Sequence, residues 1–404
     1  MRLVVPARAV SFFGDSLAFV VLSLRIAESD EPARMTSFFI AFSLPLFLLA
    51  GVAGRIVDEH DSRTLLVAAG CLQVVASVGL VLAPNFVALL AGVMVLQVGQ
   101  AVTGPAWGAV VPRIVGDAAV GRVVGVQQTL SALAGMAGAA AGGVLYDVLG
   151  YGATLLLDTA TFGVLVLVGA VVRTRRGRRY DAVWGTTASK EAAHADARLG
   201  GRRYIFDDAL LRVLVPAMWL FILSAEATNV VEVFLITGDL GASAGMYGAT
   251  MAAFMLGQIA GPLLAGRVVT DVRRIRWTSL SAATIGAAIV AVGLSPTIWV
   301  AIGMMTVAGV AGGALNALLS TLLLTRPPEH LRGRVLAAIT GTSRGFSVIA
   351  MVLGGMAGQY VGARTTFVVC GLVSVAVSVV VLRGRTAVGE EPVSTSEVLG
   401  STAF

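Results

Sequence analysis

Few side chains that can carry charge lie inside the long apolar runs of this sequence, and their types suggest proton or ion binding. Asp15 falls in the first run, Glu226 falls in the seventh, and Arg344 falls in the eleventh. The uncharged but polar Asn229 follows Glu226 by about one helical turn. Ionisable groups are costly to place in such runs and mark functional positions there. A desolvated carboxyl group can hold a proton and release it in exchange for a cationic or polar ligand. Asp15 and Glu226 are therefore candidate exchange residues, whereas Arg344 could also form a structural ion pair with an acid of the seventh run.

Uncharged polar residues in the same runs form a second group of candidates. Gln97 and Asn316 could line a cavity, or they could join neighbouring helices through hydrogen bonds. The same two alternatives hold for four other glutamines, Gln100, Gln127, Gln128 and Gln258. Glu232 lies near the end of its run, and we expect its side chain to reach the polar interface rather than to exchange protons.

A dense charged turn separates the second and third apolar runs. Gly54 is followed by Asp58 four residues later, and Asp61 and Arg63 lie just beyond. A weaker copy of the turn follows Gly266 far downstream. A glycine allows two helices to approach closely, and a carboxylate can bind the positive end of a neighbouring helix. The turn is thus a candidate contact that closes one end of the molecule, although Asp58 could also simply end a helix and solvate the loop.

Other classes of site find no support in the sequence. Lys190 is the only lysine and lies outside any glycine-rich loop, so the phosphate-binding pattern G-x-x-x-x-G-K-[ST] is absent. The three histidines lie in separate loops, and no cluster has the spacing of metal ligands. Cys71 and Cys370 each fall within an apolar run, where we expect small buried side chains rather than a disulfide. We expect neither an enzyme nor a cofactor.

The composition identifies the elements that must position these residues. The chain has 404 residues, of which 57% are hydrophobic and 13% are charged, whereas soluble domains carry about 25% charged residues. An integral membrane protein is indicated, and a spanning helix needs about 20 apolar residues. Runs of that length are too long for barrel strands. They predict an all-α fold with twelve transmembrane helices, near 8–27, 35–56, 63–82, 86–111, 122–146, 152–172, 212–237, 243–268, 275–295, 297–325, 334–358 and 364–383.

Basic residues are distributed unevenly between the two sides of these helices. If the N-terminus is cytoplasmic, the outer loops hold only Arg25, Arg34 and Arg364. Arg344 lies within a helix, so nearly all other basic residues face the cytoplasm, as the positive-inside rule requires. This pattern predicts a multi-pass protein of the plasma membrane with both termini cytoplasmic. It also explains the net charge of +6 without nucleic-acid binding.

The long connection at 173–211 divides the apolar runs into six and six. Its many arginines could bind nucleic acid or a regulator, but we expect a cytoplasmic linker that touches anionic lipid. The predicted organisation is an N-terminal six-helix bundle at 1–172, this linker, a C-terminal six-helix bundle at 212–383, and a disordered cytoplasmic tail at 384–404.

Matching glycines recur 212 positions apart in the two halves. Four pairs keep this offset without a gap: Gly54 and Gly266, Gly121 and Gly333, Gly142 and Gly354, and Gly150 and Gly362. The pattern predicts a duplicated six-helix unit. Two such units packed about an axis along the membrane normal enclose a central cavity, which is the architecture of a transporter.

The charged turn also resembles a known family signature. Gly54, Asp58 and Arg63 resemble the loop 2–3 motif of the major facilitator superfamily, roughly G-x-x-x-D-R-x-G-R-R. Asp61, in place of the second glycine, is similar to the drug:proton antiporter branch that includes macrolide and siderophore exporters. The resemblance covers residues 8–383.

Two positions depart from the family pattern. Glu59 replaces the basic residue that usually follows the aspartate of the motif. Residues 138–143 lack the proline of the helix 5 antiporter signature, roughly G-P-x-x-G-G. The second departure weakens the case for an antiporter but leaves the major facilitator fold intact.

The resemblance implies where the candidate residues lie. In this fold the second helix lies beside the eleventh, whose first turn holds Arg332 and Arg334. Asp58 would bind there when a cytoplasmic gate is shut and would separate as it opens. The first and seventh helices line the central cavity, whereas the sixth helix is peripheral, so Asp158 is left out of the expected site.

The resemblance also implies a function. We expect a secondary active transporter that exports small amphipathic molecules, drug-like or siderophore-like, by proton antiport with alternating access. Its partners would be the small-molecule substrate, protons and membrane lipids, and it would work as a monomer. The alternative within the same fold is an importer or uniporter of a small polar solute.

Overall fold

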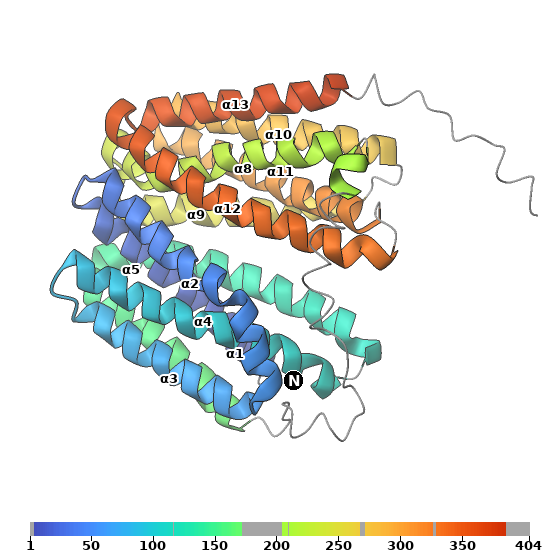
Figure 1. Cartoon of the computed structure of the whole chain (residues 1–404). Coiled ribbons are helices and arrows are strands. Elements are labelled where there is room, and N and C mark those ends of the chain that lie inside the picture. Colours follow the sequence, from blue (N-terminus) through green and yellow to red (C-terminus); the bar gives the residue numbers. More distant parts are fainter. Residues whose placement is uncertain are drawn as a thin grey trace, which may run out of the picture.

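The computed structural model describes residues 4–115, 117–171, 204–208, 210–266, 271–325 and 329–384, and the elements within these ranges are helices. The first half contains α1 to α5 and the second contains α8 to α13 (Figure 1). The helices are α1 (Val4–Ala27), α2 (Pro32–Glu59), α3 (Ser62–Val81), α4 (Phe86–Val115), α5 (Asp117–Val171), α8 (Leu211–Val233), the π-helix η1 (Phe234–Asp239), α9 (Ala244–Ala265), α10 (Asp271–Gly293), α11 (Ile298–Thr325), α12 (Glu329–Val361) and α13 (Ala363–Gly384).

Polar residues at the ends of the apolar runs begin several of these helices. The side chain of Asp61 accepts a hydrogen bond from the backbone N–H of Arg63 at the start of α3. Ser243 does the same for Met246 at the start of α9. These side chains satisfy backbone N–H groups that have no partner within the helix.

Each predicted span coincides over most of its length with described helix, so the all-α membrane fold is confirmed. Ten described segments are long and apolar enough to cross a membrane. One of them, 126–171, contains parts of two predicted spans, because the backbone of α5 leaves the helical conformation at Gly150 (φ 77°, ψ 177°). The two arms of α5 run in opposite directions: Gly142 lies against Leu17 on the way out, and Gly169 lies against Leu66 on the way back. The α12 helix, with Arg344 at its middle, is not among the ten, and twelve spans remain consistent with the fold.

Element boundaries repeat at the spacing found in the sequence. Adding 212 to the first residues of α2, α4 and α5 gives the first residues of α9, α11 and α12. Gly150 and Gly362 both have positive φ, at 77° and 85°, a conformation that side chains disfavour and glycine allows. The fold therefore consists of two six-helix repeats. The boundaries of the linker stay a prediction, because 172–203 lie outside the described residues.

The two repeats meet along a seam formed by α5 with α9 and by α2 with α12. Glycines make this approach possible. A Cβ at Gly143 would lie 2.2 Å from the carbonyl oxygen of Ala244, and one at Gly248 would lie 2.5 Å from that of Ala139. At the matching position in α12, a Cβ at Gly355 would collide with the side chain of Thr36. Small residues thus bring backbones of the two repeats into direct contact.

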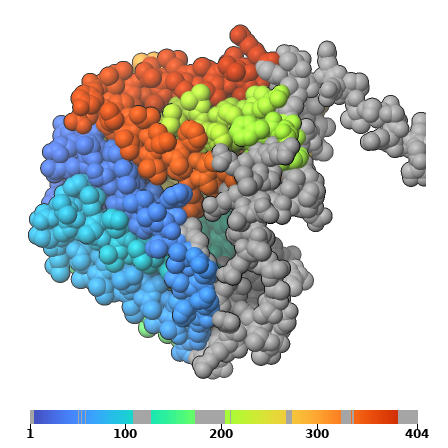
Figure 2. Space-filling model, viewed as in Figure 1, coloured from blue at the N-terminus to red at the C-terminus, as the bar shows by residue number. Residues whose placement is uncertain are grey.

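These cross-repeat contacts gather at one end of the molecule, which we call the contact end. It holds the loops at 28–31, 82–85, 240–243 and 294–297. At the opposite end, the linker end, α5 stops at Val171 and α8 starts at Leu211. The ribbons of the repeats converge toward the contact end and diverge toward the linker end (Figure 1). The surface is hollowed between the repeats on the side of the linker end (Figure 2).

The expectation that both cysteines are buried is wrong. Cys71 is exposed and Cys370 is partly exposed, and neither forms a disulfide. Cys71 lies on the outward face of α3, among apolar side chains that are also exposed, Leu72, Val75 and Val78. In a membrane protein an apolar face can be covered by lipid, so an apolar run does not imply burial within the protein.

The seam yields a first prediction. Gly143→Ala should force α5 and α9 apart, because its Cβ has no room beside Ala244. Overpacking of this kind costs about 1–3 kcal/mol, so the purified protein in detergent should melt at a lower temperature. Gly163→Ala is the matched control on the same α5, because a Cβ there meets no atom within 4 Å. Equal melting temperatures for the two variants would contradict the packing described here.

Candidate functional site

A chain of polar side chains crosses the first repeat and ends at Asp15. Gln100 of α4 donates a hydrogen bond to Asp15 Oδ2 at 3.1 Å. Gln100 Oε1 in turn accepts from Gln73 Nε2 of α3 at 2.9 Å and from Thr103 Oγ1 at 3.1 Å. Arg8, two turns before Asp15 on α1, lies near enough to interact with its charge. The network fixes the orientation of the Asp15 carboxyl group.

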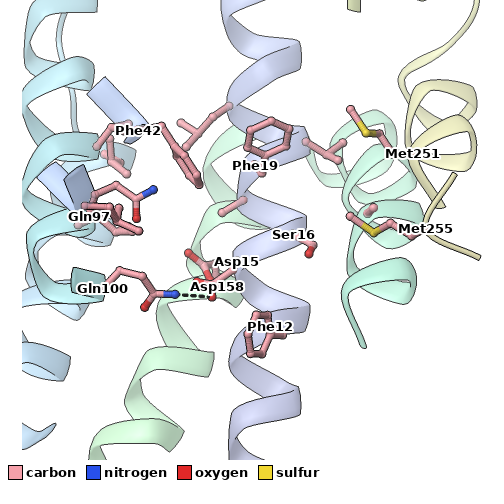
Figure 3. A pocket seen from close by; sticks show the side chains of 18 residues that line it. Phe12, Asp15, Ser16, Phe19, Phe42, Gln97, Gln100, Asp158, Met251 and Met255 are labelled. Atoms are coloured by element: carbon pink, nitrogen blue, oxygen red, sulfur yellow. Dashed lines mark hydrogen bonds between the residues drawn. The ribbon is translucent and has the colours of Figure 1, made fainter. Parts of the chain in front are cut away.

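Asp158 belongs to the same site, and the expectation that it lies at the periphery is wrong. Its side chain is 1% exposed and lies beside that of Asp15 (Figure 3). Gly14 is the physical reason for this proximity. A Cβ at Gly14 would lie 2.4 Å from Asp158 Oδ1, so only glycine lets the second arm of α5 bring its carboxyl group this close to α1. Thr161 donates a hydrogen bond to Asp158 Oδ1 at 3.3 Å, whereas Oδ2 has no hydrogen-bond partner among the described residues.

The two carboxyl groups lie on the wall of a cavity of about 330 Å³, which we call the first cavity. It lies among α1, α2, α3, α4, α5 and α9, and Ser16, Gln97 and Gln100 contribute further polar groups. The remaining wall is apolar, and its large side chains include Phe12, Phe19, Phe42, Met251 and Met255 (Figure 3). Such a cavity can hold an apolar molecule beside a small polar site.

A second cavity of about 470 Å³ lies within the other repeat, among α8, α9, α10, α11 and α13. Glu226, Gln258 and Asn316 line it, so these candidates face a cavity within one repeat rather than one between the two repeats. Asn229 donates a hydrogen bond to Glu226 Oε2 at 2.9 Å but does not line either cavity. The α9 helix separates the two cavities: Met251 and Met255 face the first, and Phe254 and Gln258 face the second.

Arg344 and Glu232, two charged residues of the predicted membrane helices, lie in different surroundings. Arg344 is exposed on α12, and within the described residues no ion pair joins it to Glu226 or Glu232. The alternative of an ion pair with the seventh helix therefore finds no support. The expectation that Glu232 reaches the polar interface is also wrong, because its side chain is only 5% exposed. Tyr247 lies near enough to interact with its charge, and η1 begins two residues later.

The predicted gate residues are described only in part. The side chains of Gly54 and Asp58 on α2, and of Arg332 and Arg334 in the first two turns of α12, lie outside the described part of the chain. Asp61 has a structural role as the N-cap of α3, which gives it a purpose independent of the family motif. Arg63 follows it and is partly buried.

Sequence comparison agrees with this architecture. The family model described as "Transmembrane secretion effector" matches residues 6–401, nearly the whole chain. The chain belongs to this family of major facilitator superfamily transporters. A member of this superfamily is a membrane transporter and not an enzyme, and its repeats, seam and cavities are those of a protein that carries a small molecule across a membrane.

Known relatives of this transporter are distant in sequence. The multidrug efflux pump Tap of Mycobacterium tuberculosis (strain ATCC 25618 / H37Rv) is 24% identical over 401 residues, which cover 94% of this chain and 92% of Tap. The MFS-type transporter YfiS of Bacillus subtilis (strain 168) is 21% identical over 387 residues, covering 94% and 91%.

Solved structures share the fold at still lower identity. The nucleoside transporter NupG superimposes with a TM-score of 0.75 at 13% identity, covering 95% of this chain and 99% of NupG. A bacterial homologue of the iron transporter ferroportin, in an inward-facing state, gives a TM-score of 0.69 at 14% identity, covering 93% and 98%.

The cap of α3 gives a second prediction. Asp61→Ala removes the acceptor for the N–H of Arg63, which is 3.0 Å from Asp61 Oδ1, and should lower stability by about 1 kcal/mol. Asp61→Asn keeps an acceptor oxygen and should retain most of the stability. Thermal melting of the purified transporter checks both variants, and an Asp61→Asn variant as unstable as Asp61→Ala would mean that the charge, not the cap, is required.

Proposed function

We propose that this transporter exports small amphipathic molecules in exchange for protons. The observation that carries the proposal is the pair of carboxyl groups, Asp15 and Asp158, on the wall of an otherwise apolar cavity. Two adjacent carboxyl groups in a nonpolar environment repel each other when both are ionised, so the pair favours holding a proton between them. A cationic or polar ligand in the cavity competes with that proton.

The cavity walls support an amphipathic substrate. Phenylalanine and methionine side chains dominate the first cavity, and flexible methionines adapt to ligands of different shape. Glu226, Gln258 and Asn316 place a few polar groups on the apolar wall of the second cavity. Tap, the efflux pump that covers nearly the same length, is consistent with export of such compounds.

Alternating access would use the seam at one end and the charged turn at the other. With the linker end in the cytoplasm of a plasma-membrane protein, the contact end faces outward and the described state is closed to the outside. Asp58 of α2 would bind the start of α12, near Arg332 and Arg334, when the cytoplasmic side closes. The transporter would work as a monomer, and its basic linker at 173–211 would touch anionic lipids.

Import or facilitated diffusion of a small polar solute is the competing function. The fold is shared with NupG, a nucleoside transporter, so architecture alone favours no direction. The buried carboxyl pair favours exchange with protons, because a uniporter has no need for a proton-holding group beside its cavity.

Inside-out vesicles give the deciding measurement, with ethidium as the amphipathic cation. A proton gradient should drive ethidium into vesicles that contain the transporter, and an uncoupler should abolish this accumulation. Asp15→Asn and Asp158→Asn should each lose the dependence on the gradient, because each removes one of the two carboxyl groups. Glu31→Gln, which changes an exposed acid outside the cavities, is the control. Accumulation insensitive to the uncoupler and to both aspartate variants would contradict proton exchange, and ethidium movement in the opposite direction would favour an importer.

The gate gives a further prediction. Asp58→Asn removes a charge that would bind a helix start and two guanidinium groups, which we expect to slow transport about tenfold, or 1.4 kcal/mol. Asp271→Asn is the matched variant in the weaker copy of the turn, where Thr270 occupies the position equivalent to Asp58, and it should have a smaller effect. Equal losses of initial ethidium transport rate in the two variants would show that the gates are symmetric.

A further inference from the structure

Glu232 is buried at the seam, away from both cavities. It lies in the last turn of α8, and its side chain is 5% exposed. It does not line the first or the second cavity. The chain leaves the α-helical pattern two residues later, where η1 begins at Phe234. A π-helix is uncommon and often marks a functional position, and its buried residues Phe234, Leu235 and Ile236 follow Glu232 closely along the chain.

Tyr247 connects the carboxyl group to the other repeat. It is 1% exposed, comes from the first turn of α9, lies near enough to Glu232 to interact with its charge, and its hydroxyl group faces Ser23. Ser23 belongs to α1 of the other repeat and is fully buried. The polar cluster Glu232, Tyr247 and Ser23 therefore bridges the two repeats. Its counterparts at the 212-residue offset are Val20, Met35 and Leu235, so the cluster is not a by-product of the repeat.

The charges on the neighbouring elements are already paired with one another. Arg25 pairs with Glu28 on α1, Arg34 pairs with Glu31 at α2, and Arg364 of α13 lies 3.9 Å from Asp239 of η1. Arg344 and Tyr360 of α12 are exposed, Cys370 of α13 is partly buried, and Glu226 on α8 itself bonds Asn229. Among the described residues, Tyr247 is thus the titratable group that faces Glu232, and no ion pair neutralises the acid.

A buried carboxylate without a positive partner is strongly disfavoured, whereas the neutral acid can be accommodated beside hydroxyl groups. We propose that Glu232 is a second proton-binding residue of this transporter, and that its proton must be bound for the contact end to close. The proposal rests on the proposed function only in assuming that the two repeats separate at this end during the cycle.

Separation of the seam would move the cluster into water. Asp147 of α5 accepts a hydrogen bond from the N–H of Gly245 at 2.9 Å, and Gly143 touches Ala244. Both contacts hold the first turn of α9, which also carries Tyr247. When α9 moves away from α5 and α1, Tyr247 leaves Ser23, and Glu232 becomes hydrated and can lose its proton. Reclosure then requires a proton from the side to which the contact end opens.

Distance measurements on the purified full chain in lipid nanodiscs test the proposal without substrate or gradient. Spin labels at Pro84→Cys and Pro296→Cys, in a background with Cys71 and Cys370 replaced by Ala, report opening of the contact end. These prolines are exposed, lie in equivalent loops and differ by 212 positions. The ratio of closed to open molecules should fall about tenfold per pH unit where Glu232 titrates, since one proton is linked to closure. Glu232→Gln should be closed at every pH, because glutamine mimics the protonated acid.

Matched variants separate the possible outcomes. Glu31→Gln should keep the pH dependence of the parent, because Glu31 is an exposed acid of the same end. A Glu232→Gln variant that titrates like the parent overturns the proposal, and so does one that fails to fold, because an amide is nearly isosteric with the neutral acid. If the pH dependence disappears in Asp15→Asn and persists in Glu232→Gln, the proton that controls the seam belongs to the first cavity. That result would refute the role of Glu232 and leave the proposed proton exchange intact.

An infrared measurement on the closed protein gives an independent readout. The carbonyl-stretch absorption of protonated carboxylic acids, to which the Asp15 and Asp158 pair also contributes, should lose one component in Glu232→Gln and stay unchanged in Glu31→Gln. An unchanged band in Glu232→Gln would show that Glu232 is ionised in the closed state and would overturn the proposal.

Discussion

Carbonyl oxygens of one repeat lie against glycine Cα atoms of the other, and this backbone contact sets the geometry of the whole transporter. The Gly142-Gly143 pair shows how two adjacent glycines serve different contacts, because Gly142 packs on α1 of its own repeat and Gly143 packs on α9 of the other. Gly354 and Gly355 divide the contacts of α12 with α8 and α2 in the same way. Each pair thus ties a seam helix to both of its neighbours, so that separating the repeats breaks the contact of one glycine and leaves that of the other.

The repeated scaffold carries unequal chemistry. Asp158 corresponds to Cys370, and Gln97 corresponds to Gly309, whose Cα lies against the carbonyl group of Phe254. A polar side chain at that position of α11 would push α9 away, whereas α4 has room for one beside the first cavity. Close packing of α9 on α11 therefore leaves no room for a counterpart of Gln97 in the second repeat. The first repeat carries a buried carboxyl pair, and the second lines a larger cavity with a single carboxyl group, that of Glu226.

Much of the fold could be predicted from the sequence, because length and hydropathy determine spans and because the repeat leaves matching glycines. Site residues could be predicted within each helix, but contacts between side chains of different helices could not. Asp15, Gln97, Glu226 and Asn316 were found as polar residues within apolar runs, and all four line cavities. Asp158 was missed because its proximity to Asp15 depends on a missing side chain at Gly14 on another helix. The pattern Gly14-Asp15 contained that signal, but a glycine does not reveal which helix fills the space it leaves.

The structure contains buried acids at two kinds of position, and we propose that different motions change their surroundings. The Asp15 and Asp158 pair lies on a cavity wall, so the ligand that enters the cavity determines what the carboxyl groups encounter. Glu232 lines neither cavity, and Tyr247 links it to the other repeat, so we expect its surroundings to change when the repeats separate. In the proposed cycle, substrate displaces a proton at the first site, whereas a proton at the second site is exchanged only with the open contact end. Because α9 contributes Met251 and Met255 to the first cavity and Tyr247 to the seam, one rigid helix connects the two events. A ligand that displaces α9 at the cavity must then also strain the seam contact that, in our proposal, the protonated Glu232 stabilises.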